Sequence, residues 1–501
     1  MKPRNTLLLL LVLAALGAYV YWVEWPQEER QAAEKKLVTL DRDAVTALTL
    51  DYPDRSITLE KKDGRWRLVK PVEADADETV VKNLLGTLAD AEVTRTLEDV
   101  ADKLASYGLD TPEATARITL ADGTALPPLK VGKTTSVGFS SYVQKGDDPK
   151  VYITGAAFQS GMKKQVKDLR DKTVITFEDQ EVQKIELARA GGPVVLERQE
   201  GDRWQITAPA SYPADGAEIR ALLASIRGIR ADDFVSDDAS ADLAPYGLTT
   251  PRLEVRVWLA KDRAQKTLLV GGTREEEQKK TIYAKRAEGP SVYTIPEYSL
   301  KNLDKDLATL RDKTVLAFEK EKAARIEVTR KDGAGFTLAK REGTWHIDTP
   351  GEGVERVPTM TRFLDDVAGM KGSEIVAEHG PDLAKFGLDA PDLTIAVSDE
   401  GGKSLGTMIA ARSTATGTDA LSHLAAAGGD VVYGVKSYSY DRIDKRAADF
   451  REKPATPVPT GAGIATPAAG GDAGLEEENL GADGEDLGDG GEDFGDEGED
   501  E

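Results

Sequence analysis

Three histidines are the residues of this chain that could serve most readily as metal ligands or general bases. They are His346, His379 and His423, and none belongs to the H-E-x-x-H helix of a zinc hydrolase. A serine nucleophile would need a histidine base, yet no histidine recurs in the repeated pattern described below. The absence of cysteine excludes thiol nucleophiles, disulfides and Cys-ligated zinc. The sequence therefore predicts no catalytic, cofactor-binding or metal-binding residues, and His346 is expected to face solvent on a strand.

A Gly-Lys-Thr triplet at residues 132–134 resembles the end of a phosphate-binding loop. Such a loop requires another glycine five positions earlier, where this chain has Pro127. The corresponding place further along the chain reads Gly271-Gly272-Thr273, without a lysine. A β-turn is the expected structure in both places. No acidic pair stands out as the two carboxylates of a glycosidase, so a carboxylate-dependent hydrolase stays an open alternative without assigned residues.

Three tryptophans could stack on a ligand, but their setting favours a structural role. Trp66, Trp204 and Trp345 are 138 and 141 residues apart, and each is followed five residues later by a proline. Two-residue turn sequences such as Asp63-Gly64 precede them, as in a β-hairpin. This setting is typical of a large aromatic side chain that fills the core beneath a hairpin.

The tryptophans belong to a pattern that occurs three times along the chain. After each tryptophan come a Tyr-Gly-Leu or Phe-Gly-Leu triplet, a Val-Tyr pair and a closing motif of Leu-Arg-Asp-Lys or Phe-Arg-Glu-Lys. The triplets start at Tyr107, Tyr246 and Phe386, the pairs at Val151, Val292 and Val432, and the closing motifs at Leu169, Leu310 and Phe450. A repeat of about 140 residues can bury a core of its own. We therefore predict unit 1 at residues 37–172, unit 2 at 173–313 and unit 3 at 314–453.

Each unit alternates β-rich segments with amphipathic helices. Strands are expected near residues 45–50, 182–187 and 324–328, and again near 115–120, 253–259 and 393–397. One helix is expected to begin after Asp77, and another to close the unit over residues 158–169. The pattern predicts βββα followed by ββββα: an α+β fold of three tandem repeats, with mainly antiparallel sheets and two helices per repeat. The closing motifs are expected to pair ionically at helix ends, with docking between units as an alternative.

The N-terminal segment has the length and polarity of a membrane anchor. Lys2 and Arg4 precede an uncharged stretch at residues 6–23, and its 18 residues would span roughly 27 Å as a helix. Aromatic residues at its far end fit the membrane interface. We predict a transmembrane anchor at 1–23 that contacts lipid through residues 6–23, and a polar stalk at 24–36. A signal peptide cleaved near Ala15-Leu16-Gly17 is the alternative.

The charge of the chain is concentrated at its C-terminus. The formal net charge is −23, but 15 acidic residues lie from Asp472 onward, which leaves 65 basic and 73 acidic residues in the rest. A mildly acidic body without a basic run argues against nucleic-acid binding. From Pro454 the composition turns to Pro, Gly, Ala and Thr and then to Gly, Asp and Glu, so residues 454–501 are predicted to be a disordered acidic tail.

The order of anchor, Gly-x-Trp with its proline, Tyr-Gly-Leu with its proline, Val-Tyr and Leu-Arg-Asp-Lys resembles the bacterial family called domain of unknown function 4340. The resemblance covers residues 37–453, although unit 3 departs from it with Phe386 and Phe450 and with a Gly/Ala/Thr-rich stretch at 404–429. It implies a membrane-anchored extracytoplasmic protein, often encoded with an ABC-type exporter and gliding-motility auxiliary subunits. No catalytic residues are implied.

The sequence and the resemblance together favour a non-enzymatic accessory or scaffold protein. It is expected in the bacterial inner membrane, with a cytoplasmic N-terminus and a periplasmic bulk, and with ABC permease and auxiliary subunits as its expected partners. A cell-envelope glycan- or peptide-binding module, with ligands held between units, is a second hypothesis. Exposed tryptophans would favour that hypothesis, and buried ones would count against it.

Overall fold

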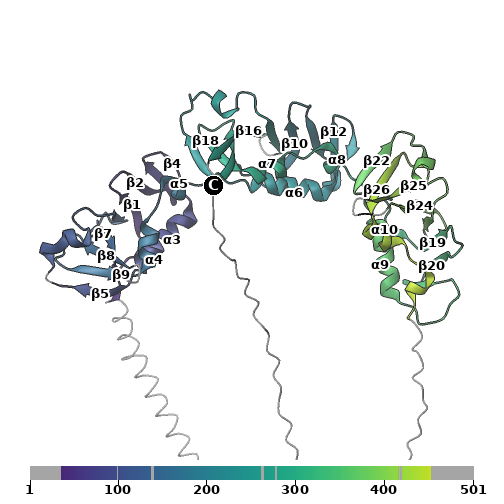
Figure 1. Ribbon diagram of the computed structural model, residues 1–501, viewed down its shortest axis with the longest axis horizontal. Coiled ribbons are helices and arrows are strands. Elements are labelled where there is room, and N and C mark those ends of the chain that lie inside the picture. The colour runs from purple at the N-terminus through teal and green to yellow at the C-terminus, as the bar shows by residue number, and fades with distance from the viewer. Residues whose placement is uncertain are drawn as a thin grey trace, which may run out of the picture.

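The computed structural model describes residues 35–452, apart from residues 99, 137–139, 261–263, 277–278, 416 and 418–419. The predicted anchor (1–23), almost all of the predicted stalk (24–36) and the predicted tail (454–501) lie outside the described residues. Within the described part of the chain, no helix is long and apolar enough to cross a membrane. Three sheets follow one another along the chain, and the three units that contain them form an arc (Figure 1).

Unit 1 is built on a nine-stranded antiparallel sheet in the order β4-β3-β2-β1-β6-β7-β8-β9-β5. Residues alternate between buried and more exposed along the central strands, as in β2, because one face of the sheet covers the core. The strands are β1 (Val45–Asp51), β2 (Ser56–Lys62), β3 (Arg65–Lys70), β4 (Ala74–Asp75), β5 (Val93–Leu97), β6 (Ala114–Leu120), β7 (Leu129–Thr134), β8 (Ser141–Lys145) and β9 (Val151–Thr154).

Unit 2 repeats this order as β13-β12-β11-β10-β15-β16-β17-β18-β14. Its strands are β10 (Val182–Ala188), β11 (Val194–Arg198), β12 (Trp204–Ala208), β13 (Tyr212–Pro213), β14 (Asp233–Ser236), β15 (Leu253–Leu259), β16 (Gln265–Glu276), β17 (Lys279–Arg286) and β18 (Val292–Pro296). The edge strand β14 comes directly after the long helix of the unit, since that helix carries the chain across the sheet to its far edge.

Unit 3 has eight strands in the order β21-β20-β19-β23-β24-β25-β26-β22, so only the two-residue strand at one edge has no counterpart. Its strands are β19 (Arg325–Arg330), β20 (Phe336–Arg341), β21 (Thr344–Ile347), β22 (Glu374–Glu378), β23 (Leu393–Ser398), β24 (Ser404–Ala411), β25 (Leu421–Ala426) and β26 (Val431–Lys436). The predicted α+β fold with antiparallel sheets is confirmed, but the units contain eight or nine strands where the sequence predicted seven. The strands that were missed, such as β4 and β5, are short or lie at sheet edges.

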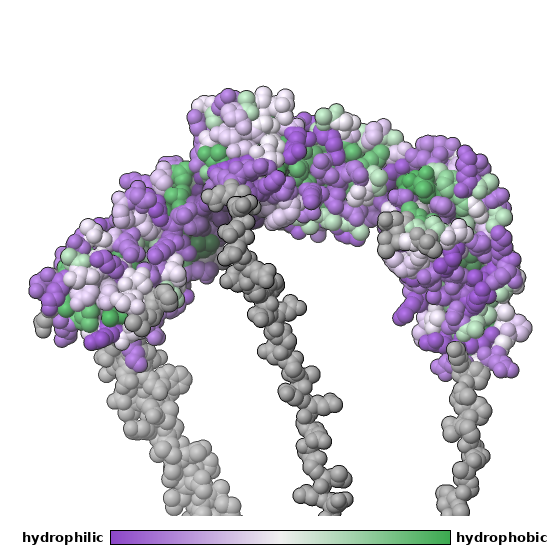
Figure 2. All heavy atoms as spheres, viewed as in Figure 1, coloured by the Kyte–Doolittle hydropathy of each residue, from purple (hydrophilic) through white to green (hydrophobic). Residues whose placement is uncertain are grey.

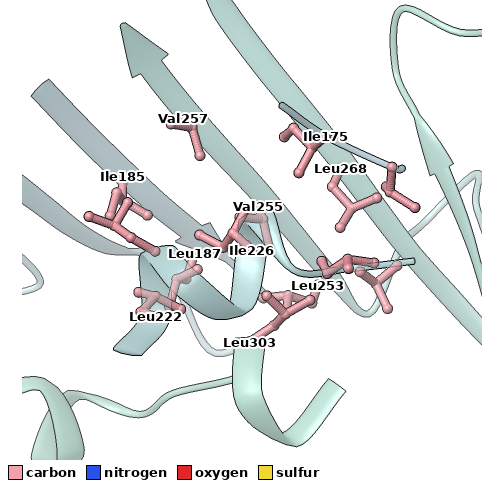
Figure 3. Packing of buried hydrophobic residues seen from close by; sticks show 14 of the residues in the cluster. Ile175, Ile185, Leu187, Leu222, Ile226, Leu253, Val255, Val257, Leu268 and Leu303 are labelled. Atoms are coloured by element: carbon pink, nitrogen blue, oxygen red, sulfur yellow. The ribbon is translucent and has the colours of Figure 1, made fainter. Parts of the chain in front are cut away.

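Helices cover one face of each sheet. They are α3 (Glu78–Ala89), α4 (Ala156–Met162) and α5 (Val166–Leu169) in unit 1, α6 (Gly216–Arg227), α7 (Glu297–Leu303) and α8 (Leu307–Leu310) in unit 2, and α9 (Val357–Ala368) and α10 (Ser437–Ile443) in unit 3. In unit 2, Leu222 and Ile226 of α6 and Leu303 of α7 lie against Leu187 and Val255 of the sheet (Figure 3). Removing such apolar surfaces from water is the main source of stability for each unit.

The helix predicted over residues 158–169 is wrong as a single element. Lys163 leaves the helical region with φ −83° and ψ 83°, which ends α4. Gln165 and Asp168 then form a capping box, in which the Asp168 side chain accepts a hydrogen bond from the Gln165 backbone N–H, and α5 begins. Two helices per repeat is therefore an undercount for units 1 and 2, where two short helices close the unit.

Candidate interaction sites at the unit junctions

The arginine of the first closing motif is buried between units 1 and 2. Arg170 follows α5, is 6% exposed and donates hydrogen bonds of 2.9 Å to both carboxylate oxygens of Asp237. Its guanidinium carbon lies 3.5 Å from the centroid of the Phe234 ring. A bidentate and stacked arginine combines charge, direction and packing in one contact. Phe234 lies on β14 and Asp237 just after it, so this contact joins the end of unit 1 to the edge strand of unit 2.

The second closing motif makes the same kind of contact between units 2 and 3. Arg311 follows α8, and its side chain is 12% exposed. It donates a 2.7 Å hydrogen bond to Glu378, the last residue of β22, and stacks over the Tyr212 ring at 3.7 Å. The ionic role predicted for the closing motifs is confirmed for Arg170 and Arg311, although their carboxylate partners lie in the following unit and not at the ends of their own helices. The structure also decides in favour of docking between units, because the acceptors of both arginines belong to the following unit.

A second ion pair accompanies each arginine. In the first junction, Nη2 of Arg230 in unit 2 lies 3.0 Å from Oδ2 of Asp77, the N-cap of α3. In the second, Nζ of Lys371 in unit 3 lies 2.7 Å from Oδ2 of Asp215, the N-cap of α6. The aspartates also accept backbone N–H bonds from the first turn of their helices. One carboxylate therefore caps a helix and holds the next unit.

The backbone continues this pattern at the start of units 2 and 3. Thr173 forms an isolated antiparallel bridge with Arg230, and Thr314 forms the equivalent bridge with Lys371. The first residue of each new unit thus lies beside the cation, Arg230 or Lys371, that binds the aspartate of the previous unit. Sequence reasoning missed these partners, although the repeat contained a signal: Arg230 and Lys371, like Asp237 and Glu378, are 141 residues apart, as are Trp204 and Trp345.

Burial and hydrogen bonding act in opposite directions on the junction carboxylates. Burial alone would raise the pKa of Asp237, but hydrogen bonds from Arg170 and Ser291 hold it below its usual value. Burial also opposes ionisation of Asp215, and the Lys371 ammonium overcomes it, so the pKa of Asp215 is lowered as well. These carboxylates are ionised at neutral pH, and their chemistry is that of fixed anions and not of proton donors.

Two clefts flank Arg170 at the first junction. One, of about 490 Å³, is lined by apolar residues that include Pro71, Val72 and Phe234 and by charged residues that include Arg55 and Lys167. The other, of about 410 Å³, is more polar and contains Asp171, Arg286 and Tyr293 among its lining residues. Mixed apolar and charged walls of this kind suit a peptide or a sugar better than a purely apolar ligand.

The histidines do not converge in space. His346 lies on β21 with its Nδ1 2.8 Å from Glu355, so it is half-buried and hydrogen-bonded, and the prediction of a simple solvent-facing position is only partly right. His379 is exposed in a left-handed turn with φ 63°. His423 lies edge-on to Phe386, with ring centroids 5.2 Å apart. Within the described residues, no group of three His, Asp or Glu side chains could hold a metal ion.

The prediction of a β-turn at residues 132–134 is wrong. These residues end strand β7, with a shift of register against β8 between Val131 and Thr134. A Cβ at Gly132 would lie 2.2 Å from the carbonyl oxygen of Tyr107, and one at Gly271 would lie 2.3 Å from that of Tyr246. Glycine is therefore present because the Tyr-Gly-Leu turn presses on the strand. The glycines of those turns, such as Gly108 with φ 69°, adopt the left-handed conformation that glycine tolerates.

The three repeat tryptophans are core residues, as their setting predicted. Trp66, Trp204 and Trp345 are 3%, 6% and 5% exposed. The backbone N–H of Trp66 donates a 2.6 Å hydrogen bond to Glu78 in the first turn of α3, which ties the hairpin to the helix. Buried rings cannot act as stacking platforms for a ligand, so the glycan-binding hypothesis loses this argument.

Fold and junctions together define a class of protein: a tandem α+β repeat array whose units are joined by buried ion pairs. The chain belongs to the family described as domain of unknown function (DUF4340), whose profile matches residues 66–203, 204–357 and 345–462. The matched segments begin at Trp66, Trp204 and Trp345, so they follow the repeat but start inside each unit.

Two further comparisons add no functional information. A search of curated proteins found no match. Among solved structures, a DnaN sliding clamp (DNA polymerase III subunit beta) from Pseudomonas aeruginosa bound to griselimycin is 11% identical, with 81% of this chain and 95% of that chain covered. Its TM-score of 0.11 is too low to carry any argument about fold or function.

Proposed function

We propose that this protein is a non-enzymatic accessory or scaffold protein of an ABC-type transport or gliding-motility-like complex. It would be anchored in the bacterial inner membrane by residues 1–23 and present its units in the periplasm. The observation that carries the proposal is the pair of buried junctions, in which Arg170 and Arg311 lock successive units together. Locked units make one extended surface, which suits a protein that positions partners. The membrane location is inferred from the N-terminal sequence, and the transport or motility complex from the family resemblance.

Two exposed tyrosines mark a surface suited to partners. Tyr298 and Tyr438 are 67% and 70% exposed and occupy the same place, the second residue of α7 and of α10. Tyrosine is enriched in protein interfaces, because its ring offers contact area and its hydroxyl a hydrogen bond. The face of the molecule in Figure 2 is largely hydrophilic, with small apolar areas between polar ones.

Photo-crosslinking in cells tests the proposal. A photoreactive phenylalanine analogue replaces Tyr298 or Tyr438 in the tagged full chain, and crosslinked partners are purified in detergent and identified by mass spectrometry. Ala157, exposed at the equivalent place in unit 1, is the matched control position. We expect ABC permease or auxiliary subunits at the tyrosine positions and not at Ala157. Recovery of envelope polymer without any transporter subunit would overturn the accessory role.

A glycan- or peptide-binding module is the second candidate, and the 490 Å³ cleft beside Arg170 is the observation that favours it. Calorimetric titration of the full chain with envelope peptides and glycan fragments tests this candidate, with Phe234→Ala as the cleft variant. Binding that Phe234→Ala removes would favour the module.

A carboxylate-dependent hydrolase has less support. A general acid needs a raised pKa, and the carboxyl groups of the described residues whose pKa values are displaced are all displaced downward. Assays of the full chain on cell-envelope glycans test this alternative directly, and turnover would overturn a non-enzymatic role.

A further inference from the structure

The ion pairs Asp77–Arg230 and Asp215–Lys371 join successive units, and the positions equivalent to their residues carry the opposite charge at the two ends of the array. Within the chain, an aspartate at the N-cap of one unit pairs with a cation of the next, as Asp77 does with Arg230. Unit 3 has Arg356 at the N-cap position, and no further unit follows it among the described residues. Unit 1 has no described unit before it, and it carries Glu92 where unit 2 has Arg230. Both ends of the array therefore change sign, and they do so in a complementary way.

Arginine is a poor local choice at position 356. An acidic N-cap accepts backbone N–H bonds and is favoured by the helix dipole, whereas a cation can do neither. The Arg356 side chain forms no capping bond to α9, is exposed and has no ion-pair partner within the described residues. The helix gains nothing from this residue, so its charge is available to a partner.

The two faces remain arranged like those of an internal junction. In unit 1, Lys36 bridges Glu92 through the backbone in the way that Thr173 bridges Arg230. The edge strand β5 follows, and three of its five residues are exposed. In unit 3, the backbone N–H of Arg356 donates to the carbonyl of Phe450, as that of Asp77 donates to Leu169.

Arg451 closes unit 3 without the kind of acceptor that its counterparts have. Arg170 and Arg311 bind carboxylates of the following unit, whereas Arg451 donates a 2.6 Å hydrogen bond to the carbonyl oxygen of Thr349 in its own unit. No carboxylate pairs with it within the described residues. Arg356 and Arg451 thus occupy, at the end of unit 3, the two positions from which Asp77 and Arg170 hold the next unit at the end of unit 1.

We propose that the end of unit 3 docks onto the open edge of unit 1 in a second copy of this chain, with Arg356 facing Glu92. Units 1 and 3 lie at opposite ends of the arc (Figure 1), so the contact joins two chains and not the ends of one. The contact is heterologous and repeats head to tail, which builds a row of copies. The reversed charges also direct unit 3 to unit 1 of the second copy, because Arg356 would face a like charge, Arg230, if unit 3 docked onto unit 2.

Cysteine crosslinking tests the proposed contact cleanly, since the chain has no cysteine of its own. Full-length chains carrying Glu92→Cys and Arg356→Cys, with different tags, are mixed in detergent and oxidised. We expect a crosslinked species of twice the chain mass that contains both tags. Arg362→Cys is the matched control, because Arg362 is an exposed arginine on the same helix but on another side. It should crosslink to Glu92→Cys at least about tenfold less.

Charge exchange separates a specific contact from chance collision. Glu92→Arg or Arg356→Glu alone should weaken self-association about tenfold or more in low salt, measured by analytical ultracentrifugation. The chain with both substitutions should associate again, because the pair is restored with its signs exchanged. The free energy of unfolding of each variant, measured in urea, shows whether its units remain folded.

Three outcomes would overturn the proposal. They are a monomeric native chain at all concentrations, equal crosslinking at Arg362, and failure of the doubly exchanged chain to associate. A fourth concerns the acidic tail as a competing occupant: if Arg356→Cys crosslinked to Ala482→Cys within one chain and not between chains, the tail would cover this face. None of these outcomes depends on the transporter, so these experiments test self-association independently of the proposed accessory function.

Discussion

Replacement of Arg170 by methionine should loosen the junction between units 1 and 2 without unfolding either unit. Methionine retains apolar contact with Phe234 but cannot hold Asp237. Breaking a buried ion pair costs about 3–5 kcal/mol. The Asp237 side chain is 35% exposed, and water can solvate it in part, so we expect the lower figure of about 2–3 kcal/mol. Arg230, with a side chain that is 52% exposed, should contribute less than about 1 kcal/mol.

Thiol labelling of a junction residue measures this loss. Ala231 is 4% exposed, and its backbone N–H donates to the carbonyl of Lys172 at 2.8 Å. Ala231 packs in the core of unit 2 and also lines the polar cleft beside Arg170. A cysteine at this position is exposed by opening of the junction as well as by unfolding of unit 2, so labelling in excess of that at a core control follows the opening equilibrium. A cost of about 2–3 kcal/mol corresponds to labelling about 30–150 times faster in Arg170→Met, since about 1.4 kcal/mol is a factor of ten.

Two controls decide whether the junction is responsible. A cysteine at Ala284, which is 0% exposed inside the sheet of unit 2, should label at the same rate with and without Arg170. Asp237→Asn combined with Arg170→Met should cost less than the sum of the two single changes, because both remove one interaction. If labelling at Ala231 rose less than about threefold, or rose equally at Ala284, the ion pair would not hold the units together.

Three further predictions follow from the geometry. Because the pKa of Asp237 is lowered in the folded chain, the stability that its carboxylate contributes is complete above the ordinary aspartate pKa of about 4 and is lost as pH falls through the folded value. The urea midpoint should therefore drop more between pH 6 and pH 3 for the native chain than for Asp237→Asn. Gly132→Ala should cost at least about 2 kcal/mol, since its Cβ meets a backbone oxygen at 2.2 Å, whereas Gly191→Ala, with open space around it, should leave the thermal midpoint within a degree or two. Equal shifts would contradict the steric argument. Arg356→Asp should stabilise unit 3 by about 1 kcal/mol by supplying the missing N-cap, and an unchanged urea midpoint would show that position 356 does not cap α9.

Local interactions were predictable from the sequence because both partners are close along the chain. Asp77 caps α3 through the N–H groups of Thr79 and Val80, two and three residues away. Gly108 lies in a left-handed turn that its own triplet requires. The apolar stripe of α3 repeats at helical spacing, and its residues Val81, Leu84, Leu85 and Leu88 are buried.

The same locality explains the prediction that failed at Gly132. Read locally, Gly-Lys-Thr suggests a turn, yet the carbonyl that requires glycine belongs to Tyr107, 25 residues earlier. The split of the closing helix has a similar origin, because the Tyr52 hydroxyl from the first half of unit 1 accepts the N–H of Lys164 between the two short helices. Propensity along one segment contains no information about a contact from another.

The sequence by itself determined the repeat, the α+β character, the buried tryptophans and the absence of a recurring reactive constellation, since each depends on residue type and short spacing. Only the tertiary structure decided what the closing arginines do. Asp237 is 67 residues from Arg170 along the chain, and the two meet because α6 carries the chain across the sheet to its far edge, where β14 faces the end of unit 1. Pairing between residues so far apart is set by the order of strands in the folded sheet, which no local pattern encodes.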